Sequence, residues 1–159
     1  MRATITIGLL MAAVLSTPSW AAGEAKPVSI GRVKSVMGTA YIIRGQAPKT
    51  PVKPTPDQIA KPGQVLLQSD MIQTGKDGSL GITFADNSRF AVGPNTNLVL
   101  SQFEFDNTTH RGRFLTTVNK GTVAINSGQI AHENKDAMKV RTPVSLLAAR
   151  GTRFVVEVP

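Results

Sequence analysis

Short apolar runs alternate with turn-forming residues along most of the chain after residue 27. The pattern is densest between residues 62 and 93, where Leu80, Ile82 and Phe84 recur at every second position and Gly, Asp, Asn and Ser cluster on either side. Alternation of period two indicates a β-strand with one apolar face. Turn signals recur about every 8–12 residues, a spacing typical of a sandwich, roll or barrel. The pattern predicts an all-β fold, a single compact sandwich or roll of short, mainly antiparallel strands.

The strands are expected wherever β-branched and aromatic residues gather without proline. The predicted strand segments are residues 28–33, 39–44, 65–67, 71–74, 80–84, 90–92, 98–105 with a slip between Leu100 and Phe103, 114–118, 122–125, 138–142 and 154–158. Residues 119–121 read as a hairpin turn. The apolar residues of segment 154–158 predict burial on both faces or a place at the centre of a sheet. Any helix is expected to be one short turn between Pro143 and Ala149.

The predicted core contains the apolar residues that recur on one face of these strands. They are Val33, Ile42, Leu80, Ile82, Phe84, Phe90, Val92, Leu100, Val123, Ile125 and Phe154. Turn residues support this frame. Gly75 and Gly78 are expected to adopt backbone angles closed to other residues, and Asp70 and Asp86 to accept backbone hydrogen bonds at turns.

A proline-rich segment, residues 46–61, interrupts the strand pattern. Proline removes a ladder donor and fixes φ, so this segment is not an interior strand. It is interpreted as an exposed loop, dispensable for folding, or else as a proline-rich recognition ligand. Lys49, Lys53 and Lys61 give it positive charge.

The first residues have the layout of a secretory signal peptide: Arg2, an apolar run over residues 5–15, and small residues around Ala21. The apolar run is shorter than the roughly 20 residues that span a bilayer. The expected organisation is a signal peptide over residues 1–21, a flexible lead-in over 22–27 and one all-β domain over 28–159. The predicted location is periplasmic or secreted, with no transmembrane span after cleavage.

The chain has no cysteine, which removes disulfides, thiolate metal sites and thiol nucleophiles together. It has 18 Lys and Arg against 10 Asp and Glu, a net charge of +8, and loss of Arg2 with the signal leaves +7. Such a charge attracts anionic partners over a long range. Export argues against nucleic acid and favours anionic lipid headgroups, acidic glycans or an acidic protein face as the partner. The other interpretation is a solvated basic surface that keeps the protein soluble.

No catalytic constellation is recognisable in the sequence. His110 and His132 are the two histidines, and both lie in polar, loop-like stretches without metal-ligand spacing. A Gly-x-Ser-x-Gly elbow is absent. The expectation is a protein that is not an enzyme and has no catalytic residue, metal or cofactor.

Several motifs, in order along the chain, resemble FecR-type domains. The core signature is matched by residues 63, 70–75 and 80–88, the first strand pair by 31–33 and 36–40, a later hairpin by 120–123, and the closing motif by 140–143 and 149–154. Known members are membrane-spanning regulators that relay iron-siderophore occupancy of an outer-membrane transporter to a cytoplasmic sigma factor. Their domain is periplasmic and contacts other envelope proteins. No anti-sigma segment is recognisable in this sequence.

The resemblance implies an exported, non-catalytic binding or scaffolding module that contacts an envelope protein or anionic polymer. The alternative is a component of a FecR-type envelope signalling system that regulates a sigma factor or transporter. The residues predicted to contact the partner are Lys49, Lys53, Lys61, Arg150 and Arg153. Arg150 has a second interpretation, in which it only fixes a turn before Gly151.

Overall fold

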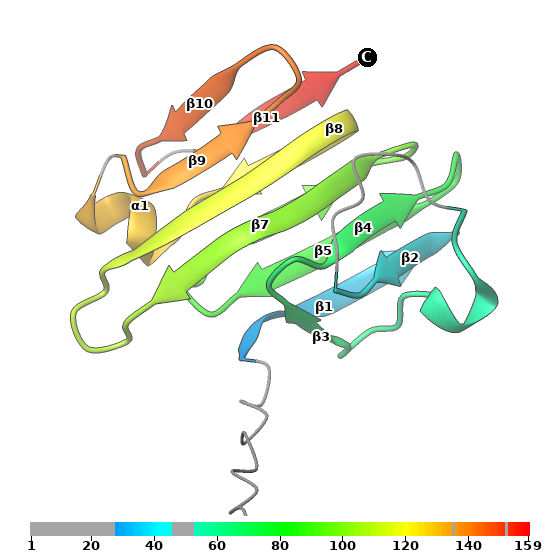
Figure 1. Cartoon of the computed structure of the whole chain (residues 1–159), viewed down its shortest axis with the longest axis horizontal. Helices are drawn as coiled ribbons and strands as arrows, with labels where there is room; N and C mark the ends of the chain where they lie inside the picture. Colours follow the sequence, from blue (N-terminus) through cyan, green and yellow to red (C-terminus); the bar gives the residue numbers. More distant parts are fainter. Residues whose placement is uncertain (1–27, 46–52, 135, 152) are drawn as a thin grey trace, which may run out of the picture.

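The computed structural model describes residues 28–45, 53–134, 136–151 and 153–159, and these are almost entirely β (Figure 1). The signal peptide and lead-in predicted for residues 1–27 lie outside the described residues. The elements are β1 (Ser29–Met37), β2 (Ala40–Ile43), the 3-10 helix η1 (Pro56–Gln58), β3 (Val65–Leu67), β4 (Met71–Thr74), β5 (Ser79–Phe84), β6 (Arg89–Val92), β7 (Asn97–Phe105), β8 (Gly112–Asn126), α1 (Gln129–Glu133), β9 (Met138–Arg141), β10 (Leu146–Ala149) and β11 (Arg153–Val158).

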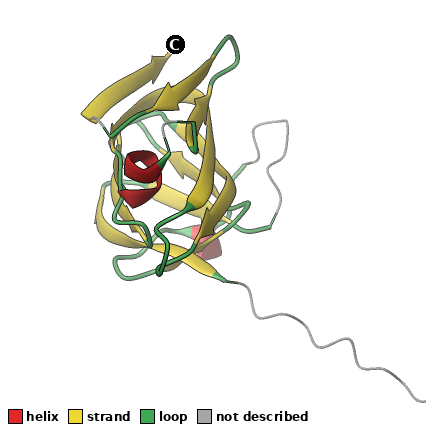
Figure 2. Ribbon diagram, turned by 90° about the vertical axis from the view of Figure 1, so that its left-hand side faces the viewer, coloured by secondary structure: helices red, strands yellow, loops and turns green. Residues whose placement is uncertain are grey.

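The strands form one strongly curled sheet, a half-barrel, which confirms the predicted all-β class. Neighbouring strands follow the order β2-β4-β7-β8-β6-β5-β1-β3. β9 and β10 extend the sheet beyond the first part of β8, and β11 pairs with its last part. All these pairs are antiparallel except β8 with β9. Figure 2 shows α1 lying across one open end of the curled sheet.

β8 holds the two halves of the sheet together. Its first part pairs with β7 and β9, and its last part pairs with β6 and β11. The partner strands of β8 change near Gly121. There φ is +92°, and a Cβ on this residue would overlap Thr96. The predicted hairpin at residues 119–121 is therefore wrong. Glycine bends one continuous strand there instead of reversing the chain.

The core lies inside the curl and is built around four phenylalanine rings. The ring of Phe84 lies 4.8 Å from that of Phe90 and 4.7 Å from that of Phe114, both edge to face, and Phe103 packs beside them. Such geometry adds about 0.5–1.5 kcal/mol per pair beyond burial. Ten of the eleven predicted core residues are buried, and Phe154 is only partly buried against the core.

Two predictions near the C-terminus are wrong. Residues 146–149 form strand β10 instead of a helical turn, because they pair along their whole length with β9. The helix α1 lies earlier, at Gln129–Glu133, and buries Ile130 and Ala131 in the core. Segment 154–158 lies at an edge rather than at a sheet centre, since β11 pairs with β8 alone among the described strands.

The proline-rich segment is described from residue 53 onward, and it does not stay clear of the body. Residues 53–59 are exposed or half-exposed, as predicted. Ala60, however, is buried in the core and its N–H donates to the carbonyl of Ala40 at 2.8 Å. Ile59 forms a bridge with Tyr41 of β2. The end of this segment therefore covers the outer edge of β2, and the prediction that the whole segment is an exposed loop is wrong there.

Candidate functional site

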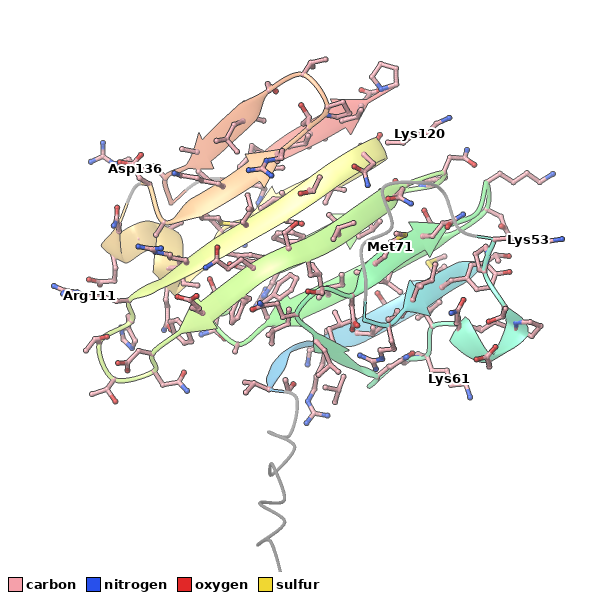
Figure 3. All side chains as sticks on the ribbon, in the orientation of Figure 1. Lys53, Lys61, Met71, Arg111, Lys120 and Asp136 are labelled. Atoms are coloured by element: carbon pink, nitrogen blue, oxygen red, sulfur yellow. The ribbon has the colours of Figure 1, made fainter. Side chains whose placement is uncertain are left out.

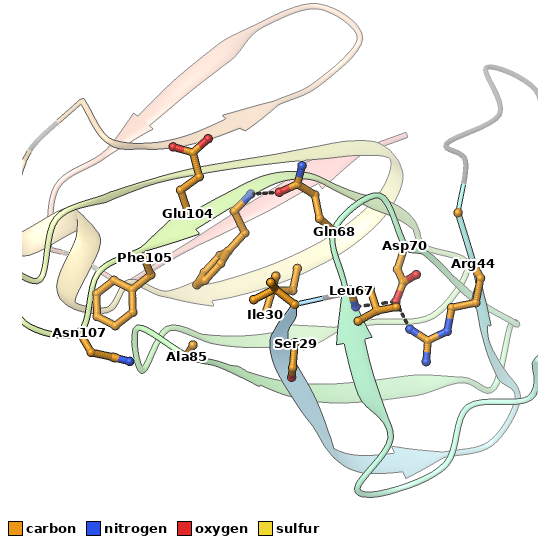
Figure 4. A pocket seen from close by; sticks show the side chains of 13 residues that line it. Ser29, Ile30, Arg44, Leu67, Gln68, Asp70, Ala85, Glu104, Phe105 and Asn107 are labelled. Atoms are coloured by element: carbon orange, nitrogen blue, oxygen red, sulfur yellow. Dashed lines mark hydrogen bonds and ion pairs between the residues drawn. The ribbon is translucent and has the colours of Figure 1, made fainter. Parts of the chain in front are cut away.

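The two ends of the strand path, β2 and β3, meet at a seam closed by an ion pair (Figure 4). Arg44 follows β2 and donates from Nη1 to Asp70 Oδ2 at 2.6 Å. Its Nη2 donates to the carbonyl of Val65 in β3 at 2.8 Å. The N–H of Leu67 donates to the same Asp70 oxygen at 2.8 Å. The predicted role of Asp70 as a backbone acceptor at a turn is confirmed, and the ion pair adds a link between the two sheet edges.

The Asp70 carboxylate is held in a poorly solvated place. Its side chain is 1% exposed, whereas that of Arg44 is 44% exposed. Burial raises the pKa of Asp70 above 3.8, while the N–H of Leu67 and the charge of Arg44 oppose that rise. The Oδ1 atom is buried and has no hydrogen-bond partner. The seam therefore depends on Arg44 to keep this carboxylate charged inside the fold.

An open groove of about 710 Å³ runs beside the ion pair, and we name it the seam groove. Its surface is mostly apolar. The lining residues are Val28, Ser29, Ile30, Arg44, Gly45, Leu67, Gln68, Asp70, Ala85, Phe103, Glu104, Phe105 and Asn107. Figure 4 shows polar side chains of Gln68, Glu104 and Asn107 around it. Such a combination, apolar walls with a few polar groups, is typical of a binding site.

Local geometry fixes the shape of the seam groove. Ser69, in the turn between β3 and β4, adopts φ +68° and donates its N–H to the carbonyl of Leu100 at 2.8 Å. The N–H of Phe103 donates to Gln68 Oε1 at 3.2 Å. The register of β7 against β8 shifts between Val99 and Gln102. The sequence predicted a slip in this segment, between Leu100 and Phe103. These contacts hold β7 against the β3–β4 turn.

A second surface carries positive charge on the outer side of β8 and β9, and we name it the basic face. In the β8–β9 register Leu115 lies beside Lys139 and Thr117 beside Arg141, and Arg113 lies on the same side of β8. All three cations line a shallow groove of about 510 Å³ that also holds Asp136. The ion pair found among the described residues is Arg44 with Asp70, so none of the three cations has a carboxylate partner there.

The structure does not bring the predicted partner-binding residues together. Lys49 lies outside the described residues. Lys53 and Lys61 are exposed on either side of η1, at the end of the molecule that holds β2 (Figure 3). Arg150 and Arg153 are exposed around Gly151, which lies against the His132 ring of α1. Among the described residues no hydrogen bond or ion pair links the two groups, and their role in binding stays a prediction.

Sequence reasoning did not single out the seam groove or the basic face. Arg44 and Asp70 are 26 residues apart, and no local pattern shows that they meet. The basic face did leave a signal. Lys139 and Arg141 alternate with Met138 and Val140, which places both cations on the outer side of one strand.

The described residues give no sign of a metal centre or a membrane-crossing helix. No group of three or more His, Asp and Glu in this part of the chain lies close enough to hold a metal ion. His110 stacks on Phe105 with ring centroids 6.3 Å apart. No helix among the described residues is long and apolar enough to cross a bilayer.

Fold and surface together define an all-β module with an open, mostly apolar groove. The family model for the FecR protein matches residues 70–158, more than half of the chain, and the chain therefore belongs to the FecR family. FecR domains occur in envelope signalling regulators of sigma factors, a regulatory rather than an enzymatic family. No curated protein and no solved structure matches the chain. The matched residues include Asp70 and all of the basic face.

Proposed function

We propose that this chain is an exported, non-catalytic binding module of the cell envelope that contacts an envelope protein through the seam groove. The observation that carries the proposal is the groove itself, an apolar hollow of about 710 Å³ beside a fixed ion pair. Membership of a regulatory family favours a protein partner over a small molecule. The apolar residues of the groove suit apolar side chains of an extended segment, and Gln68 and Asn107 offer hydrogen bonds to its backbone.

Filling the groove tests this proposal. Ala85 lines the groove and its side chain is exposed, so Ala85→Trp adds a large ring without disturbing the core. Ala91 of β6 is also exposed and does not line the groove, which makes Ala91→Trp a matched control. The exported chain is crosslinked in its own envelope and its partner recovered by pull-down. We expect Ala85→Trp to reduce recovery by about tenfold, as a loss of roughly 1.4 kcal/mol would, and Ala91→Trp to leave it unchanged. Equal recovery with both variants would remove the groove from the proposal.

The basic face favours a second candidate function, the binding of an anionic envelope polymer. Arg113, Lys139 and Arg141 lie on one side of two paired strands and lack carboxylate partners among the described residues. A Lys139→Glu, Arg141→Glu variant should weaken binding to an acidic polysaccharide, and raising salt from about 50 to about 200 mM should weaken it further. Reversal of the exposed Lys34 and Lys76 is the control for net charge. If all variants bind the polysaccharide as well as the unchanged chain does, the basic face does not bind it and serves only solubility.

The family also keeps a signalling role open, in which this domain is one component of a system that regulates a sigma factor or transporter. Genes for such a sigma factor and transporter beside this one would favour that role. Export itself is part of the proposal and rests on the layout of the first 21 residues. Mass spectrometry of the protein recovered from the envelope should find an N-terminus at Ala22 or Gly23.

A further inference from the structure

β11 leaves one side of its backbone without a partner. Its six residues, Arg153–Val158, pair in unbroken register with β8, and no other described strand pairs with it. The other edge strands are shorter: β3 has three residues and β2 and β10 have four. β2 is also covered in part by the bridge from Ile59. A long edge strand without a bulge or an internal proline is a ready site for pairing with another strand.

The outward side chains of β11 form a row with a positive charge at one end and a negative charge at the other. Two such rows in antiparallel orientation have complementary charges. Phe154, Val156 and Val158 turn toward the core and are buried or half-buried. The exposed positions alternate with them: Arg153 is cationic, Val155 is 63% exposed, and Glu157 is anionic. Neither Arg153 nor Glu157 has an ion-pair partner among the described residues.

From this row we propose that two copies of the chain pair through β11 in an antiparallel arrangement around a two-fold axis at Val155. In that register Arg153 of each copy lies opposite Glu157 of the other, and the two Val155 side chains face each other. A two-fold interface requires such self-complementarity, because the same patch serves both partners. Opposed side chains in an antiparallel pair lie about 4.5–5.5 Å apart at Cβ, close enough for both ion pairs and the apolar contact.

The surroundings of β11 support an interface at this rim of the molecule. β10 and β11 lie at the same rim of the molecule in Figure 1. Among the described residues, four of the seven most exposed large apolar side chains belong to this region: Val144, Leu146, Leu147 and Val155. Apolar residues concentrated beside an open sheet edge mark a surface that a partner covers.

Charge exchange gives the decisive test, made with the exported chain by sedimentation velocity from about 1 μM to about 1 mM. The unchanged chain should dimerise. Arg153→Glu places Glu opposite Glu, and Glu157→Arg places Arg opposite Arg, so each variant alone should raise the dimer dissociation constant by about tenfold or more. Mixing these two variants restores both opposite-charge pairs in a heterodimer, and the mixture should regain association. The double variant should also dimerise with itself.

Thiol crosslinking tests the register independently, because the chain has no cysteine of its own. Val155→Cys should give a covalent dimer on mild oxidation or with a short bismaleimide, since the opposed Cα atoms lie within disulfide range. Met37→Cys is the control, an exposed apolar position on β1 far along the chain from β11. A monomer at all concentrations, a dimer indifferent to the charge variants, or equal crosslinking at both positions would each overturn the proposal.

Discussion

Asp86 shows how one buried carboxylate organises the junction between the β5–β6 turn and the start of α1. It is fully buried in the turn between β5 and β6, where Oδ1 accepts from the Ser88 N–H at 3.0 Å and Oδ2 from the Ser88 hydroxyl at 2.7 Å. The Ser88 oxygen in turn accepts from the N–H of Gly128, just before α1. A Cβ at Gly128 would overlap Asp86 and Ser88, so only glycine allows α1 to start there.

The pH dependence of stability should report on Asp86. Burial raises its pKa above 3.8, although the hydrogen bonds from Ser88 oppose that rise. The folded state therefore binds the proton more tightly than the unfolded chain, and its stabilising contribution is full below pH 3.8 and is lost as pH rises through the folded-state pKa. Asp86→Asn keeps a side-chain acceptor but cannot ionise. Urea unfolding should show wild type losing stability relative to this variant as pH rises above 3.8. A difference that stays constant with pH would show that Asp86 is not the group that titrates.

Phe84 lies at the centre of the aromatic core, in contact with the rings of Phe90, Phe103 and Phe114. We expect Phe84→Ala to lower the free energy of unfolding by about 3–5 kcal/mol, since a large buried ring leaves a cavity. Phe105→Ala, at a half-buried position, should cost clearly less. Chemical denaturation measures both, and a loss below about 1 kcal/mol for Phe84→Ala would place its ring outside the core.

Glycines show why residue roles are harder to predict than residue burial. Gly75 and Gly78 were both expected to need an unusual backbone angle, yet neither is among the glycines with positive φ. Gly78 has a different constraint. It is required because a Cβ would overlap the carbonyl of Thr39, a residue 39 positions earlier in the chain. A local turn signal identifies the glycine, but the reason for it lies in a tertiary contact that no local pattern contains.

At the scale of elements, β8 decides how the sheet curls, and Gly121 decides where. Gly121→Ala should lower the free energy of unfolding by at least about 2 kcal/mol, because positive φ and overlap with Thr96 each carry a cost of about 1–3 kcal/mol. Gly63→Ala is the matched control: φ there is +82° but nothing lies within 4 Å of a Cβ. It measures the cost of φ alone. Equal losses in the two variants would mean that the approach to Thr96 does not constrain the bend.

Elements could be predicted where strand-type residues were bounded by turn residues, and the prediction failed where the local composition suited a helix. The segments that became β4, β5 and β7 have clear patterns bounded by turn residues, and all three form strands. Residues 145–149 have a composition that suits a helix, yet pairing with β9 over four residues makes them a strand. In so short a run, tertiary pairing outweighs local propensity.

At the scale of the whole molecule, the class of fold followed from the sequence but its closure did not. Strand segments and turns predict a sandwich or roll, and ten of eleven core positions are correct. The order of strands from β2 to β3 depends on which strands pair, and so does the seam where these two strands meet. Pairing joins residues far apart in sequence, such as Arg44 and Asp70, so the seam groove could not be located beforehand. The positive charge was evident, but its placement on β8 and β9 required the register of those strands.

The seam ion pair gives a test of how the half-barrel is held closed. Arg44→Met removes the cation and leaves the buried Asp70 carboxylate with the Leu67 N–H alone. The free energy of unfolding should fall by about 1–3 kcal/mol near neutral pH, the usual cost of an unsatisfied buried acceptor. The loss should be smaller than for a fully buried ion pair, because solvent screens the charge of Arg44, which is 44% exposed.

The sign of its pH dependence follows from Asp70. Without Arg44 the pKa of Asp70 rises further, so the variant gains most from protonation, and the stability difference from wild type should shrink as pH falls toward 3.8. Arg89→Met, at an exposed position without an ion-pair partner among the described residues, is the control and should show little change at any pH. Hydrogen exchange should show faster opening of β2 and β3 in Arg44→Met than in the control, because those edges lose their link. If both variants exchange alike and the difference in stability is the same at low and neutral pH, the backbone contacts of the β3–β4 turn close the half-barrel without the ion pair.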